Sequence, residues 1–186
     1  MSMSALSESL SRSLLKMAGW TVQCTVPDYP KSILCVAPHT SNWDFILGKL
    51  AYASLGRKSG FLMKSSWFFF PLGIIFRAIG GVPVTRKPGS ELTRLLTERF
   101  KRSKQLTIAI TPEGTRSKTT KWHTGFLHIA HDAEIPIILG AIDFRTKTIF
   151  LDKIYISTGN VDYDLQIIKD FYKPFEGKYP EKFSTD

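Results

Sequence analysis

Short apolar strand patterns alternate with helical patterns along this chain, and this alternation constrains its fold more than any other feature. The apolar stretch at residues 33–37 precedes a helical pattern at 43–55, and the stretch at 106–110 precedes one at 124–132. The other predicted strands lie at residues 21–26, 61–63, 82–84, 135–141 and 148–156, and the other helices at 90–101 and 162–172. This order predicts an α/β fold, a layered mixed sheet flanked by helices.

The N-terminal residues 1–20 carry a short amphipathic helical pattern, with Arg12 and Lys16 among its apolar side chains. Those apolar side chains are Leu6, Leu10, Leu14 and Met17. Such a helix either packs on the domain or anchors it to anionic lipid. With 186 residues in all, the chain is expected to form this helix and one α/β domain over residues 21–186.

The charge of the chain predicts anionic partners, because 25 lysines and arginines outweigh 16 acidic residues. Nucleic acid, an anionic membrane surface and a phosphorylated small molecule all fit this charge. Nucleic acid is not expected, since the sequence has no zinc finger, RNA-recognition motif or clustered basic helix. No metal site is expected either, because no ligand cluster has zinc spacing.

The apolar segments predict a protein without a membrane-spanning helix. The longest segment, residues 67–76, is broken by Pro71 and Gly73, whereas a span needs about 20 apolar residues. The N-terminus lacks the apolar core of a secretory signal. Cys24 and Cys35 are expected to be free thiols in a reducing compartment. We therefore expect a cytoplasmic protein that is peripherally attached to the membrane.

The first polar motif is His39-Thr40-Ser41-Asn42-Trp43-Asp44, which separates a predicted strand from a predicted helix. Across a tight turn, Asp44 can fold back toward the His39 ring. A carboxylate on one ring nitrogen fixes the tautomer and leaves the other nitrogen to accept a proton. The pair is therefore a candidate general base for activating a hydroxyl.

The second motif, Thr111-Pro112-Glu113-Gly114-Thr115-Arg116-Ser117, follows the predicted strand at 106–110. Gly114 permits a sharp turn, Thr115 and Ser117 offer hydroxyls, and Arg116 offers a fork for phosphate. An ordinary turn with solvated charges is the alternative. Two further cations follow predicted strands, Lys64 and Arg86, and each is either a site residue or a solvated loop residue.

These motifs together resemble the glycerol-phosphate and lysophosphatidate acyltransferases. The family has four ordered blocks, which here read as His39 to Asp44, Gly81 to Arg86, Ile110 to Ser117, and Ile135 to Ile138. Its lysine followed by aromatics, proline and glycine is matched by Lys64, Trp67, Pro71 and Gly73. The chain departs from the pattern at Thr85, at Ile110-Thr111 and at Leu139-Gly140, which bears on the acceptor more than on the chemistry.

The resemblance implies a fatty-acyl transfer from acyl-CoA or acyl carrier protein, as co-substrate, to a hydroxyl of a lyso-glycerolipid or related lyso-lipid, without a cofactor. It implies that His39 is the base and Asp44 its orienting acid. The implied acceptor and phosphate site comprises Lys64, Arg86, Glu113, Gly114, Thr115, Arg116 and Ser117. The implied acyl or acceptor pocket includes Pro136. From their apolar character, Trp67, Phe68 and Phe69 line an acyl slot, contact the membrane or belong to the core.

Three other functions remain open from the residues themselves. A thioesterase or lipase would use water as its acceptor, although no G-x-S-x-G nucleophile motif is present. A basic nucleic-acid-binding protein would fit the charge. A lipid carrier would bind lipid and turn nothing over. Free fatty acid release, a salt-dependent gel shift or binding without turnover distinguishes these alternatives from acyl transfer.

Overall fold

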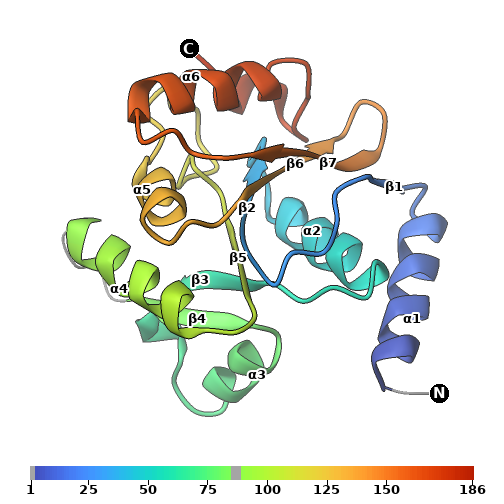
Figure 1. The fold of residues 1–186 in the computed structure, drawn as a ribbon. Helices are drawn as coiled ribbons and strands as arrows, with labels where there is room; N and C mark the ends of the chain where they lie inside the picture. Colours follow the sequence, from blue (N-terminus) through green and yellow to red (C-terminus); the bar gives the residue numbers. More distant parts are fainter. Residues whose placement is uncertain (1–2, 85–88) are drawn as a thin grey trace.

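The computed structural model describes residues 3–84 and 89–186 as a layered α/β fold (Figure 1). Within this part of the chain, the strands are β1 (Thr21–Cys24), β2 (Lys31–Ala37), β3 (Gly60–Lys64), β4 (Gly81–Val84), β5 (Leu106–Ile110), β6 (Ile137–Asp143) and β7 (Thr148–Tyr155). They form one sheet in the order β1-β7-β6-β2-β5-β3-β4. Only β6 and β7 pair antiparallel, so the sheet is mixed and the predicted fold class is confirmed.

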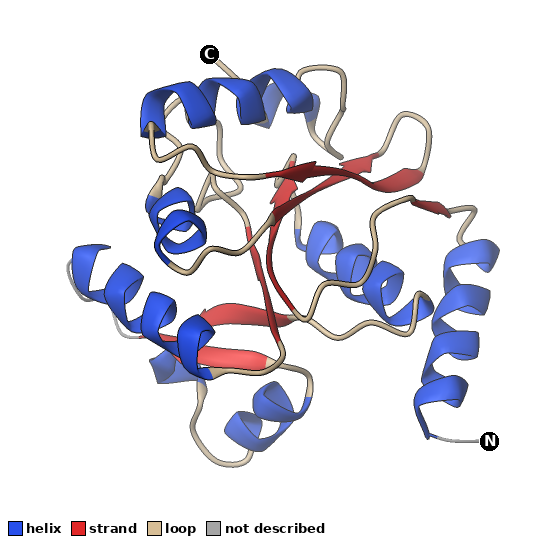
Figure 2. Ribbon diagram, viewed as in Figure 1, coloured by secondary structure: helices blue, strands red, loops and turns tan. Residues whose placement is uncertain are grey.

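Helices cover both faces of the sheet, as Figure 2 shows. One face carries α1 (Met3–Met17) and α2 (Asn42–Ser54), and the other carries α4 (Gly89–Arg102), α5 (Gly125–Asp132) and α6 (Val161–Tyr172). Successive side chains of a strand point to opposite faces. Ile33 and Cys35 of β2 therefore join the core under α4, α5 and α6, whereas Leu34 joins the core under α2.

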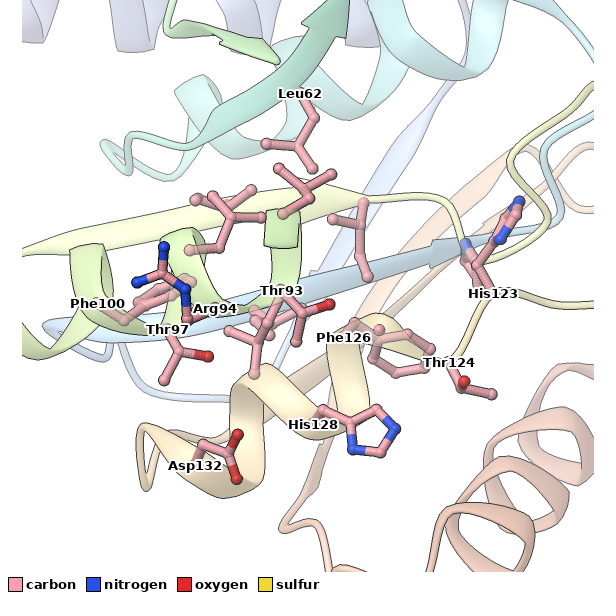
Figure 3. A pocket seen from close by; sticks show the side chains of 18 of the residues that line it. Leu62, Thr93, Arg94, Thr97, Phe100, His123, Thr124, Phe126, His128 and Asp132 are labelled. Atoms are coloured by element: carbon pink, nitrogen blue, oxygen red, sulfur yellow. The ribbon is translucent and has the colours of Figure 1, made fainter. Parts of the chain in front are cut away.

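The helices α4 and α5 leave a cavity of about 1170 Å³ above the sheet (Figure 3). A second cavity, of about 650 Å³, lies on the opposite face beside α2. The parallel strands β2, β5, β3 and β4 all end at one edge of the sheet. The polar motifs of the sequence follow these strands, so the fold gathers them along that edge.

The aromatic segment that contains Pro71 and Gly73 forms helical structure. A 3-10 turn at Ser65–Trp67 precedes α3 (Leu72–Ala78), which contacts β4. Pro71 occupies the position just before the first helical residue, where its missing N–H removes no helical hydrogen bond. The proline therefore begins this helix rather than preventing it. β4 is an edge strand, which can accommodate Pro83 although this residue has no N–H to donate to a neighbouring strand.

Helix α1 packs on α2 through a face that the apolar pattern did not identify. Ser11 and Leu15 are buried, and Arg12 donates a hydrogen bond to the carbonyl of Ser54. The predicted apolar stripe of Leu6, Leu10, Leu14 and Met17 is instead exposed. Among the described residues, no helix is both long enough and apolar enough to cross a bilayer.

Candidate active site

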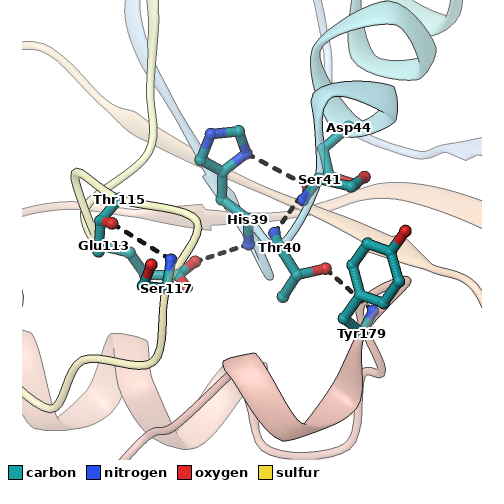
Figure 4. Close-up of polar contacts among 8 residues, drawn as sticks. All are labelled: His39, Thr40, Ser41, Asp44, Glu113, Thr115, Ser117 and Tyr179. Atoms are coloured by element: carbon teal, nitrogen blue, oxygen red, sulfur yellow. Dashed lines mark hydrogen bonds and ion pairs between the residues drawn. The ribbon is translucent and has the colours of Figure 1, made fainter.

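The loop between β2 and α2 brings His39 and Asp44 together (Figure 4). Ser41 is the N-cap of α2 and Asp44 is the third residue of the helix, so the acid side chain turns back over the loop. His39 Nδ1 lies 3.2 Å from Asp44 Oδ2. The His39 ring is about one-fifth exposed, whereas the Asp44 side chain is buried. A buried carboxylate thus contacts an imidazole that is partly open to solvent.

Asp44 is fixed by the loop that it supports. Its Oδ2 accepts hydrogen bonds from the backbone N–H groups of Thr40 and Ser41, both at 2.8 Å, and its Oδ1 accepts one from Ser41 Oγ at 2.9 Å. The contact with His39 Nδ1 has ion-pair distance, but it is not aligned as a hydrogen bond. Catalytic hydrogen bonds commonly tighten only when substrate binds.

Glu113 joins the two predicted motifs to each other. Its Oε1 accepts a hydrogen bond of 2.7 Å from the backbone N–H of His39 (Figure 4). Burial raises the pKa of Glu113 to about 8, while the bond from His39 opposes this shift and the nearby Asp44 charge adds to it. Near neutral pH the Glu113 carboxyl therefore binds a proton more readily than an exposed glutamate does.

The loop after Glu113 has a backbone that requires glycine. Gly114 has φ of +63°, and a Cβ on it would lie 2.5 Å from the His123 ring. Thr115 Oγ1 accepts a hydrogen bond from Ser117 N at 3.2 Å, which closes the turn. Arg116 is exposed and lines the same cavity as His39. The turn thus presents a cation beside the candidate base.

The cavity beside α2 extends from this pair of motifs into the protein. His39, Asp44 and Arg116 line it, and its remaining wall is mainly apolar. The apolar and glycine residues of that wall are Leu34, Val36, Phe45, Ile46, Gly48, Phe61, Leu62, Met63, Ala109 and Ile110. A concave apolar site with few convergent polar groups is typical of a binding pocket for an apolar ligand.

Several predicted site residues do not line this cavity. Lys64 is exposed at the end of β3, next to the lining residue Met63. Trp67 and Phe69 are exposed and Phe68 is half-buried, and none of the three lines either large cavity in the described chain. Arg86 lies outside the described residues.

Pro136 lies at the opposite edge of the sheet from His39. It immediately precedes β6, and its carbonyl accepts a hydrogen bond from Ile33 N near the start of β2. Because β6 runs parallel to β2, the start of β6 is remote from the carboxyl end of β2 that carries His39. The structure therefore does not bring Pro136 to the candidate site.

Lys49 is a site residue that the sequence reasoning missed. It lines the cavity beside α2, and its Nζ donates a 2.9 Å hydrogen bond to the carbonyl of Ser59. Burial lowers the pKa of Lys49. The available signal was a single lysine within the apolar helical pattern of residues 45–51. Within the described residues, no three His, Cys, Asp or Glu side chains cluster as metal ligands.

Comparisons with known proteins identify the family of the chain and a similar fold. The acyltransferase family model matches residues 21–142, whereas no curated protein sequence matches the chain significantly. Among solved structures, the chain is similar to the 1-acyl-sn-glycerophosphate (LPA) acyltransferase PlsC from Thermotoga maritima. The identity is 17%, the TM-score is 0.62, and the alignment covers 92% of this chain and 78% of that one. This likeness indicates a shared fold.

Proposed function

The chain belongs to the acyltransferase family, and we propose that it transfers a fatty-acyl group from an acyl thioester to a hydroxyl of a lyso-glycerolipid or related lyso-lipid. The donor is acyl-CoA or acyl carrier protein, and no cofactor takes part. One observation carries this proposal: the His39–Asp44 pair and Arg116 line a single, mainly apolar cavity. A base, a cation for an anionic group and an apolar slot are what such a transfer requires.

In the proposed reaction, Asp44 holds the His39 ring so that Nε2 accepts the proton of the acceptor hydroxyl. The hydroxyl oxygen attacks the thioester carbonyl and forms the new C–O bond. The tetrahedral intermediate then collapses, the C–S bond breaks, and the sulfur takes the proton from the His39 imidazolium. The products are an ester and a free thiol. A positioned base of this kind contributes about 10²–10⁴-fold to the rate.

The loop after β5 supports binding of an anionic head group. Arg116 is exposed and lines the cavity, so its guanidinium can pair with phosphate oxygens. Gly114, Thr115 and Ser117 shape this turn, and Lys64 ends β3 at the same edge of the sheet. Arg86, from the block that resembles the family's glycine-strand-arginine pattern, is the further cation of this proposal. We propose that these residues bind the anionic head group of the acceptor.

For Glu113 we propose a positioning role. Its Oε1 already accepts a hydrogen bond from His39 N, and the residue is only 3% exposed. The side chain therefore links the phosphate-binding loop to the loop of the base. The acyl chain of the donor occupies the cavity beside α2, which takes the place of the slot expected around Trp67, Phe68, Phe69 and Pro136.

The protein acts on lipid at a membrane surface to which it attaches peripherally on the cytoplasmic side. The support is exposed apolar surface, which is costly in water and favourable in the lipid interface. The exposed apolar side chains of α1 are one such surface. The segment from Trp67 to Ile79 exposes further large apolar side chains. They are Trp67, Phe69, Phe70, Ile74, Ile75 and Ile79.

The substitution His39→Ala tests the proposed reaction. We expect kcat to fall by about 10²–10⁴-fold, because the base is removed, while thermal unfolding changes little. Mass spectrometry of products from mixed lyso-lipids with each donor measures the transfer and identifies both substrates. Unchanged turnover in this variant contradicts the assigned base. Free fatty acid that forms without any lipid acceptor, and in equal amount with one, indicates a hydrolase instead.

A further inference from the structure

The cavity between α4 and α5 lies on the other face of the sheet from the proposed donor slot (Figure 3). Its floor is formed by strand residues, including Ile33, Ile108 and Ile110, and its sides by α4 and α5. Leu96 and Phe100 of α4 and Phe126 of α5 add further apolar wall. At about 1170 Å³ it exceeds the roughly 300–1,000 Å³ of common ligand pockets.

A buried hydroxyl in this cavity has no partner. Thr97 is 8% exposed, lines the cavity from α4, and its Oγ1 makes no hydrogen bond. Close-packed cores rarely leave such a group unsatisfied, so the free hydroxyl marks a place beside α4 that other protein atoms do not fill. Figure 3 shows Thr97 beside Arg94 on α4, with His128 and Asp132 on α5. Six more polar or charged residues also line the cavity, and its apolar residues lie mainly on the sheet and on the inner sides of the two helices. The six are Thr93, Glu98, Lys101, Thr111, His123 and Thr124.

The same cavity reaches the candidate active site. Thr111 and Pro112, which immediately precede Glu113, are part of its wall, and His123 N donates to the Pro112 carbonyl at 2.8 Å. Ile110 and Thr111 line the cavity beside α2 as well. The two cavities therefore lie on opposite faces of the sheet and approach each other at the carboxyl end of β5.

We propose that the cavity between α4 and α5 binds the hydrocarbon chain that the lyso-lipid acceptor already carries. This inference rests on the proposed function. The donor chain is assigned to the cavity beside α2, because His39 opens into that cavity and the thioester carbonyl must reach the base. The acceptor chain then lies on the opposite face of the sheet, and the polar ends of the two substrates meet where β5 ends.

Filling each cavity in turn tests the assignment. Thr97→Phe places a ring in the cavity between α4 and α5. Gly48→Leu is the matched control in the cavity beside α2, where a Cβ on Gly48 would meet only the Ile142 side chain, at 3.9 Å. Steady-state kinetics compare a long-chain lyso-lipid with the same head group lacking a chain, each with a constant thioester donor.

We expect Thr97→Phe to raise the KM of the long-chain acceptor about tenfold and to leave the donor KM and turnover of the chainless acceptor unchanged. Gly48→Leu should raise the donor KM instead. An unchanged KM for the long-chain acceptor in Thr97→Phe, or a rise in the donor KM alone, overturns the assignment. If Thr97→Phe lowers the unfolding temperature, Leu92→Phe replaces it, because Leu92 lines the same cavity and is only partly buried.

A binding measurement separates this inference from the proposed reaction. Calorimetric titration of a long-chain lyso-lipid into the His39→Ala protein, without donor, does not depend on turnover. If the double variant His39→Ala/Thr97→Phe binds the lyso-lipid about tenfold more weakly than His39→Ala alone, the site is supported, even if the wild-type protein transfers no acyl group. Equal binding with and without Thr97→Phe overturns the site, even if acyl transfer by the wild-type protein is established.

Discussion

Asp44 combines two tasks in one carboxylate. It accepts two backbone hydrogen bonds from the loop and contacts the His39 ring from the start of α2. A spacing of five residues does not align side chains within a helix. It works here because His39 lies before the N-cap Ser41, in a loop that curls over the first turn.

The substitution Asp44→Asn tests both tasks, each with its own measurement. The amide has nearly the same shape, but it is neutral and no longer stabilises a protonated ring. We expect kcat to fall by about 10²–10⁴-fold, and the free energy of unfolding to fall by about 1–3 kcal/mol as charge-assisted hydrogen bonds are lost. Steady-state kinetics and urea denaturation measure the two effects. Wild-type kcat in this variant contradicts the orienting role.

Glu113 predicts an unusual pH dependence of stability. Its pKa is raised from 4.5 to about 8 by burial, so the native state disfavours the carboxylate. The native state then binds more protons than the unfolded state between these values, and stability is lost as pH rises through them. Glu113→Gln stays neutral and does not share this loss. Relative to this variant, the wild-type free energy of unfolding should fall from about pH 4.5 to about pH 8.

Urea denaturation of both proteins across this pH range measures the difference. A wild-type protein that gains stability relative to Glu113→Gln as pH rises contradicts a raised pKa. The glutamine can still accept the hydrogen bond from His39 N, so the comparison isolates the charge. Asp143, which accepts hydrogen bonds from two backbone N–H groups elsewhere, contributes equally to both proteins.

At the scale of single residues, local contacts were predictable and distant ones were not. The approach of Asp44 to His39 follows from a turn of a few residues. The bond from His39 N to Glu113 joins residues 74 positions apart, and its geometry depends on how β2 and β5 pair. The sequence patterns do not predict the register in which β2 and β5 pair.

At the scale of elements, α1 and α3 show where periodicity misleads. The apolar stripe of α1 was correctly identified as amphipathic, but Leu15 and Ser11 make the contact with α2. Pro71 and Gly73 were interpreted as breaks in the apolar segment at residues 67–76, whereas Pro71 is the N-cap of α3 and Gly73 lies in its first turn, so neither prevents the helix. Position within an element decides the effect of such residues.

The C-terminal segment contacts the loop between β2 and α2, which contains His39 and Thr40. Tyr179 N donates a 3.2 Å hydrogen bond to the buried Thr40 Oγ1. A Cβ on Gly177 would lie 2.7 Å from Thr40 side-chain atoms and 3.2 Å from Pro38. This segment lies beyond the residues that the family model matches, so its contact with the loop is an addition to the shared region.

Gly177→Ala should displace Thr40 and, with it, the adjacent His39. We expect kcat to fall about tenfold or more with a smaller change in KM, since small misplacements of catalytic groups are costly. Tyr179→Ala is the matched control, because it keeps the backbone N–H that bonds Thr40. Full kinetics of both variants measure the effect. Equal losses of kcat in the two variants contradict a brace made by close backbone approach.

At the scale of the whole molecule, the alternation of strands and helices was sufficient for the fold class. It did not provide the strand order, in which β1 pairs with β7 and β3 lies between β5 and β4. It also did not provide the two cavities, because each forms between a helix and strands that are distant in sequence. Packing of remote elements produces both features.

The exposed stripe of α1 predicts binding to anionic vesicles. Replacing Leu6 and Leu10 with glutamine removes apolar area that would enter the lipid interface, so we expect binding to weaken about tenfold or more. Vesicle sedimentation at low and high salt measures it, and salt should weaken wild-type binding by screening the basic residues. Tyr163→Gln, at an exposed position on α6, is the control. Undiminished binding of the double variant contradicts attachment through α1.

The pairing of β1 with β7 has a consequence for biosynthesis. β1 is an edge strand, so its hydrogen-bonding neighbour is the strand at Thr148–Tyr155, near the other end of the chain. As the polypeptide leaves the ribosome, the residues Thr21–Cys24 cannot form their hydrogen bonds to β7 until most of the remaining residues have been translated. The nascent protein thus completes its sheet only late in synthesis. A chain halted before β7 leaves β1 without its only neighbour and β6 without one of its two neighbours.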